Sequence, residues 1–145
     1  MSNDLISKKK RASWRLAFFL LGLLVAIDQI SKGFAGDVYK NHDFAFSLRA
    51  NVYLMYGVYL IVLTSIFFYL RRAWQGLAVL DKTLWLMILA GGLSNLIERL
   101  FLGYVRDFIY FGSGAFNFAD LYIILGVALL LLGEIFKIKN KGVIQ

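Results

Sequence analysis

Four long apolar blocks, separated by short polar segments, constrain this chain more than any other feature. Residues 50–70 contain no charged side chain, and a helix needs about 20 mostly apolar residues to cross a bilayer core. Blocks 16–27, 83–97 and 121–133 are also uncharged, although ionisable residues stand beside each of them. We therefore predict an all-α membrane protein with four transmembrane helices, at about 14–35, 50–70, 83–101 and 118–137.

The basic residues are distributed unevenly along this arrangement. The formal net charge is +7, and most of the 16 lysines and arginines fall in the two tails and in the loop between the second and third spans. The positive-inside rule then places both termini in the cytoplasm. We expect a basic cytoplasmic tail at 1–13, a transmembrane domain at 14–137 and a second basic tail at 138–145. The tails are expected to lie on anionic phospholipid rather than nucleic acid.

Two residue types are too scarce for several kinds of chemistry. The chain has no cysteine, which excludes disulfides, a thiol nucleophile and thiolate metal ligands. Its single histidine, His42, excludes a histidine-cluster metal site and disfavours a serine–histidine triad. We therefore expect neither a metal nor another cofactor.

Most acidic residues of the membrane region lie toward the outer ends of the predicted spans. Asp81 and Glu134 are the exceptions, and each has a lysine nearby. Ionisable residues at membrane depth usually face a bundle interior or a water-filled cavity, and they often mark function. The converging acids are Asp28, Glu98, Asp107 and Asp120.

Asp28 and Lys32 are four residues apart and share one helix face, so they can form an ion pair. From the spacing alone, the favoured interpretation is a pair at the membrane edge with Lys32 extending outward to the headgroups. The functional alternative is that one of the two holds a substrate or a catalytic group.

The third span combines small and polar residues. Ala90, Gly91 and Ser94 form a surface that allows close helix approach. Asn95 and Arg99 share a face, and Glu98 is about one turn from Asn95. This pattern predicts helix packing with a hydrogen-bond network. Alternatively, Asn95 or Arg99 binds a polar group such as a peptide carbonyl or a lipid headgroup.

The stretch "AFNFAD" opens the fourth span. Asn117 is well placed as an N-cap, with Asp120 at the third helical position, where a carboxylate complements the helix dipole. Asp107 lies in the apolar stretch "VRDFIYF", where desolvation beside a like charge would make it hold its proton longer. The two acids could share a proton and supply a base and an acid. Spacing alone leaves an aspartyl hydrolase and an ion or proton pathway open.

Four motifs, taken in order, resemble the lipoprotein signal peptidase (signal peptidase II) family: "DQISK", "NHDFAFSL", "GGLSNLIERLFLGYVRDFI" and "FNFADLYIILG". The resemblance covers about residues 20–130. It implies a four-helix intramembrane aspartyl protease of the bacterial inner membrane, with its active site toward the extracytoplasmic face. Such an enzyme cleaves a prolipoprotein before a diacylglyceryl-modified cysteine and is inhibited by globomycin-type cyclic peptides.

The resemblance assigns the catalytic pair to Asp107 and Asp120. Its first-loop motif also includes Ala45 and Phe46, and we expect Phe44–Phe46 to form a short strand or an interfacial segment. Further positions implied for substrate binding or for support of the site are Asp28, Lys32, Asn41, Asn95, Glu98, Arg99, Asn117 and Ala119.

The sequence departs from the family pattern at four points. Glu98 stands where the family has aspartate, and Asp43 stands where it has glycine. The first outer loop and the connection from Asp107 to Asp120 are also shorter than the family pattern. Two alternatives to a peptidase are therefore a catalytically impaired relative that binds lipoproteins or membrane partners, and a small channel or transporter subunit.

Overall fold

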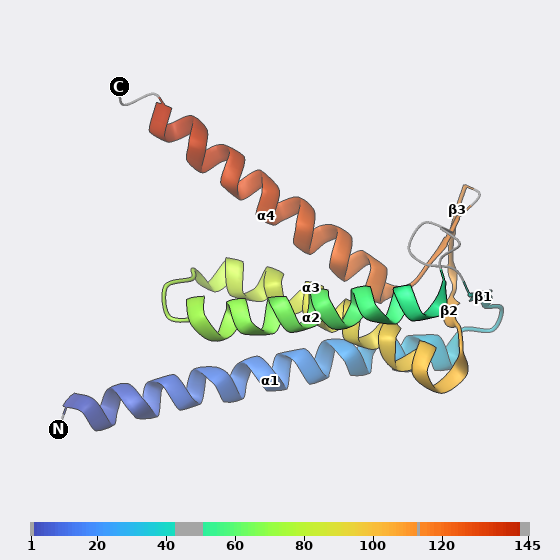
Figure 1. The fold of residues 1–145 in the computed structure, drawn as a ribbon, viewed down its shortest axis with the longest axis horizontal. Coiled ribbons are helices and arrows are strands. Elements are labelled where there is room, and N and C mark those ends of the chain that lie inside the picture. The colour runs from blue at the N-terminus through green and yellow to red at the C-terminus, as the bar shows by residue number, and fades with distance from the viewer. Residues whose placement is uncertain (1, 43–50, 113, 143–145) are drawn as a thin grey trace.

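The computed structural model describes residues 2–42, 51–112 and 114–142. Four helices dominate this part of the chain, and each contains a segment long and apolar enough to cross a membrane (Figure 1). The predicted fold class is therefore confirmed. The helices are α1 (Ser2–Phe34), α2 (Val52–Ala73), α3 (Val79–Leu102) and α4 (Phe118–Gly142).

The helix boundaries follow local chemistry. Asn51 caps α2 by accepting a hydrogen bond from the backbone N–H of Tyr53 at 2.9 Å. Gly103 ends α3 because its φ of 79° is left-handed, a conformation that costs glycine little. α1 extends back to Ser2, so most of the tail predicted at 1–13 continues the first helix instead of preceding it.

α3 is the central helix of the bundle. In its most apolar segment 61% of residues are buried, against 11–17% in the other three helices, and it packs against all of them. A Cβ on Gly91 would lie 2.3 Å from the carbonyl oxygen of Ala119, so the missing side chain lets α4 start directly on α3. The predicted small-residue contact is confirmed.

Two short antiparallel strand pairs cover the end of the bundle where α1 and α3 finish and α4 begins (Figure 1). Strand β1 (Tyr39–Asn41) pairs with β2 (Val105–Asp107), and β3 (Ile109–Phe111) pairs with β4 (Gly114–Phe116). All four strands lie between the predicted spans, where the sequence predicts a strand or interfacial segment only at Phe44–Phe46. Asp43 and Phe44–Phe46 lie outside the described residues.

Both termini lie at the opposite end of the bundle from the strands (Figure 1). Toward that end, α1, α2 and α3 enclose an apolar core that includes Ala17, Leu70 and Trp74. The outward faces of the helices carry exposed large apolar side chains, such as Phe19 and Leu60. Such faces are unusual in water and are expected where helices contact lipid.

Candidate active site

Lys32, near the end of α1, is buried at the strand-covered end of the bundle. Its ammonium lies 2.7 Å from Asp28 and 2.8 Å from Glu98, and it donates a hydrogen bond to the Asn95 side-chain oxygen at 2.9 Å. The predicted pair is confirmed, but the expectation that Lys32 extends outward is wrong. Two carboxylates and an amide replace its hydration inside the bundle, so the side chain turns inward.

Asp28 connects three helices. One carboxylate oxygen accepts the backbone N–H of Ala119 at 2.9 Å, and the other accepts the Ser94 hydroxyl at 2.7 Å. Gln29 donates to the same hydroxyl at 2.8 Å. Ala119 contributes through its backbone, and Asp28 thereby fixes the first turn of α4 against α1 and α3.

Asn117 and Asp120 form a reciprocal cap at the start of α4. The backbone N–H of Asp120 donates to the Asn117 side chain at 3.0 Å, and the backbone N–H of Asn117 donates to the Asp120 carboxylate at 3.1 Å. This is the geometry of a capping box, with aspartate in the place of glutamate. The predicted N-cap is confirmed, and the cap fixes the position of the Asp120 carboxylate.

Asp107 is fully buried at the end of β2. Its carboxylate accepts hydrogen bonds from the side-chain amides of Asn41, at 2.9 Å, and Asn117. Burial raises the pKa of Asp107 to about 6, the hydrogen bond from Asn41 opposes the rise, and the neighbouring charge of Asp120 adds to it. The direction matches the prediction that Asp107 holds its proton longer.

Asp107 and Asp120 line the same cavity, whose volume is about 490 Å³. Asn117 connects the two acids because it donates to both carboxylates. Asn95 donates to the other oxygen of Asp120 at 2.9 Å, so each of the four carboxylate oxygens accepts a hydrogen bond from an amide. The geometry offers two carboxylates in one partly enclosed space, held by neutral donors.

Glu98 and Arg99 are adjacent on α3, but their side chains contact different parts of the structure. Glu98 is buried and pairs with Lys32 and Arg106, and it also accepts the backbone N–H of Arg106 at 3.1 Å. Arg99 lines the cavity and donates to the Tyr59 hydroxyl at 3.0 Å. Glu98 thus holds β2 against α1 and α3, whereas Arg99 faces the space between the aspartates and α2.

The structure brings all ten predicted site residues to this end of the bundle and adds several that the sequence did not single out. Arg106 and Gln29 were detectable, since each is the neighbour of a chosen residue and carries a polar group. Tyr59 had no such signal, because it lies within the uncharged block 50–70 and resembles any other aromatic residue there. Its role emerges only when α2 packs beside Arg99.

Comparisons with known proteins show which family this chain resembles. The profile of the family described as signal peptidase (SPase) II matches residues 20–136. A lipoprotein signal peptidase of Fusobacterium nucleatum is 31% identical, over 86% of this chain and 89% of that protein. One from Acinetobacter baylyi is 38% identical, over 70% and 62% respectively.

A solved structure described as a bacterial membrane enzyme shares the fold. It has a TM-score of 0.74 at 21% identity and covers 87% of this chain and 91% of its own. The family profile covers most of the chain, and the Fusobacterium nucleatum relative matches over most of both proteins. The chain belongs to the signal peptidase II family.

Proposed function

We propose that this protein is an intramembrane aspartyl endopeptidase that removes the signal peptide from diacylglyceryl-modified prolipoproteins, with Asp107 and Asp120 as its catalytic pair. The observation that carries the proposal is the shared cavity. Two acids from β2 and α4 line it together, and Asn117 donates a hydrogen bond to each. Family membership supplies the substrate class.

The pair would act through water, without a covalent intermediate. The ionised carboxylate takes a proton from water, the hydroxide oxygen attacks the peptide carbonyl carbon, and the protonated carboxyl gives its proton to the carbonyl oxygen. Proton transfer to the amide nitrogen then lets the C–N bond break. The raised pKa lets Asp107 keep its proton to a higher pH than an ordinary aspartate, although the two acids titrate as a unit.

The amides beside the pair have positioning roles in this proposal. Asn41, Asn95 and Asn117 orient the carboxylates without neutralising them, because they donate hydrogen bonds but carry no charge. Asp28, Lys32 and Glu98 lie behind them as a buried ion-pair network. Arg99, on the cavity wall, would orient the peptide carbonyl.

The substrate would approach from within the membrane. Ile123 and Ile124 of α4 also line the cavity, and they give it an apolar side toward the lipid. The diacylglyceryl group would lie between helices there, with the signal peptide beside α2, α3 and α4. Globomycin-type cyclic peptides would compete for the same cavity.

The proposed location is the bacterial inner membrane, with this site toward the extracytoplasmic face. The excess of lysine and arginine at the opposite end supports that orientation, with the basic tails in the cytoplasm. A multi-pass bacterial membrane protein agrees with the four apolar helices and with the family.

The alternatives are less well supported. A channel would distribute its acids through the membrane, but Asp28, Glu98, Asp107 and Asp120 meet at one end. A catalytically impaired relative would require Glu98 or the short outer loops to disturb the site, and Glu98 pairs with Lys32 and Arg106 behind the cavity.

The test is cleavage of a purified diacylglyceryl-modified prolipoprotein by wild type, Asp107→Asn and Asp120→Asn. Loss of either carboxylate should lower the rate by about a thousandfold or more. Asp81→Asn, at the other end of α3, is the matched control and should cleave normally. Persistent cleavage in both site variants would refute the assignment, and a folded but inactive wild type would favour the impaired relative.

A further inference from the structure

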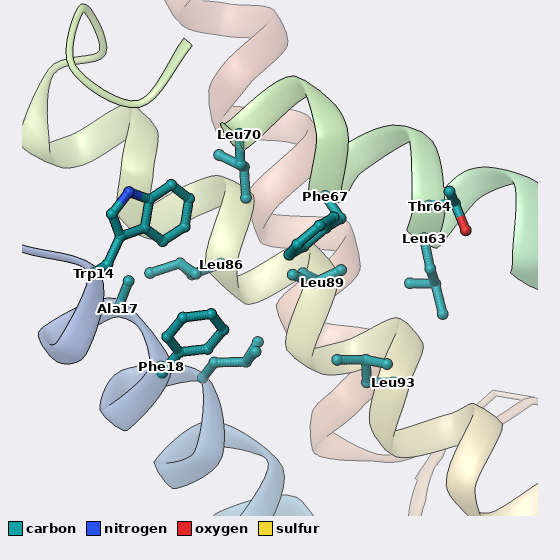
Figure 2. A pocket seen from close by; sticks show the side chains of 11 residues that line it. Trp14, Ala17, Phe18, Leu63, Thr64, Phe67, Leu70, Leu86, Leu89 and Leu93 are labelled. Carbon is teal, nitrogen blue, oxygen red and sulfur yellow. The ribbon is translucent and has the colours of Figure 1, made fainter. Parts of the chain in front are cut away.

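A second cavity lies among α1, α2 and α3 and shares no lining residue with the cavity of the aspartates. Its volume is about 350 Å³, and Figure 2 shows side chains of α1 and α2 on its two sides with α3 behind them. The walls include Ala17 and Phe18 of α1, Phe67 and Leu70 of α2, and Leu86 and Leu89 of α3. None of these residues belongs to the candidate active site.

The lining of this cavity is almost entirely apolar. Among its described lining residues Thr64 alone carries a hydroxyl, and the others are apolar or aromatic. A water molecule needs two to four polar partners, so an apolar cavity of this kind is suited to an apolar guest. α1 and α2 each pack against α3 but make few contacts with each other, so the cavity lies where the two helices diverge.

The shape is elongated along the helices. The lining runs from Leu86 to Leu93 on α3 and from Trp14 to Leu21 on α1, about two turns or roughly 10 Å in each case. An extended hydrocarbon chain fits that outline better than a compact ligand does. Trp14 closes the end nearer the termini by stacking on Trp74, with ring centroids 4.5 Å apart.

Positive charge gathers at this tryptophan-closed end. The Lys82 ammonium lies 5.4 Å from the Trp74 ring centroid, and Arg71 and Arg72 directly follow the lining residue Leu70. Arg15 follows Trp14, and the three arginines are exposed. Basic clusters beside pockets between transmembrane helices are suited to anionic lipid headgroups.

We propose that this cavity binds one acyl chain of an anionic membrane glycerophospholipid, whose phosphate lies among Arg15, Arg71, Arg72 and Lys82. The apolar walls take the chain, and the basic end selects a headgroup with a net negative charge. This lipid site requires the protein to be embedded in a membrane, but it does not depend on the proposed peptidase activity.

The three tryptophans of the chain provide a built-in probe. Trp14 lines the cavity, Trp74 stacks on it, and Trp85 packs against the same apolar core. The full-length protein would be placed in phosphatidylcholine vesicles, and phosphatidylglycerol with brominated acyl chains would be added as a quencher. Quenching should saturate at a low mole fraction, with a preference over brominated phosphatidylcholine of about fivefold per engaged basic residue.

Matched variants test the apolar cavity and its basic end separately. Ala17→Phe and Thr64→Phe fill the cavity without adding a tryptophan, and either one that folds should abolish saturable quenching. Lys82→Gln should lower the preference for phosphatidylglycerol several-fold. Lys137→Gln, a basic residue on α4 outside the cavity, should leave it unchanged.

Several results would overturn the proposal. Equal quenching by the two lipids would mean ordinary contact with surrounding lipid. Unchanged quenching in both filled variants would mean surface attraction without an acyl-chain site. Displacement of the quencher by an unlabelled signal peptide would assign the cavity to substrate, and quenching that falls as protein density rises would assign it to a second copy of the chain.

Discussion

Asp107, at the end of β2, is an acid whose pKa is raised strongly by its surroundings. It is fully buried, and the donors from Asn41 and Asn117 are neutral amides that stabilise a carboxylate less than a cation would. Burial and the charge of Asp120 together raise its pKa to about 6. The ionised form of Asp107 therefore lowers the stability of the folded state, and the carboxyl holds its proton to a higher pH than an ordinary aspartate does.

The stability of the protein should therefore depend on pH through Asp107. Its folded pKa is raised from an ordinary 3.8 to about 6, so the stabilising effect of its proton is complete at low pH and is lost as pH rises from 3.8 through 6. This loss should be about 3 kcal/mol. The thermal unfolding temperature should fall more steeply with rising pH for wild type than for Asp107→Asn across this range. Parallel curves would contradict the assignment.

Glu98 supports the site through its length as well as its charge. Its carboxylate reaches Lys32 on α1 and both the side chain and backbone N–H of Arg106 on β2. Glu98→Asp withdraws the carboxylate by one methylene and should lower the cleavage rate by about tenfold, because β2 carries Asp107. Glu134→Asp, at the other end of the bundle, serves as the control. A marked gain in activity would instead mean that Glu98 impairs the site.

At the scale of elements, the contact between α3 and α4 determines where Asp120 lies. Gly91 leaves room for the Ala119 carbonyl oxygen, which a Cβ would approach to 2.3 Å. Because the obstructing atom is backbone, the start of α4 has to move if a side chain is added. The reciprocal cap formed by Asn117 and Asp120 would move with it.

Gly91→Ala should therefore reduce cleavage by about a hundredfold, because a displacement near 1 Å is enough to disturb a preorganised site. Gly133→Ala is the matched control on α4, since a Cβ there meets no atom within 4 Å. Cleavage and thermal unfolding would be measured for both. Normal cleavage by Gly91→Ala would contradict the close packing of α4 on α3.

Some structural elements could be predicted from the sequence, and others could not. Helix spans and the Asn117 cap follow from hydropathy and local chemistry, and both were predicted. The strands are three residues long and depend on pairing between distant segments, such as Tyr39 with Asp107, so local pattern did not reveal them. The burial of Lys32 was missed for the same reason, since Glu98 and Asn95 approach it from another helix.

At the scale of the whole molecule, both termini lie at the end away from the strands and the aspartates (Figure 1). The basic residues concentrate toward that end, which supports a cytoplasmic location for both tails. The sequence predicts this orientation through charge alone.

The natural absence of cysteine allows the orientation to be measured directly. Single cysteines would be introduced as Asp37→Cys, between α1 and β1, and as Ser7→Cys and Asn140→Cys near the termini. A membrane-impermeant maleimide added to intact spheroplasts should label the first variant, and the other two should react only after permeabilisation. The reverse pattern would contradict the proposed orientation.

The central claim is that Asp107 and Asp120 work as one catalytic unit. The most direct measurement is the cleavage rate of a diacylglyceryl-modified prolipoprotein by Asp107→Asn, Asp120→Asn and the double variant. The account predicts that each single variant loses nearly as much activity as the double variant, since one carboxylate without the other cannot complete the proton transfers. Losses that multiply in the double variant, or a single variant that cleaves at the wild-type rate, would contradict it.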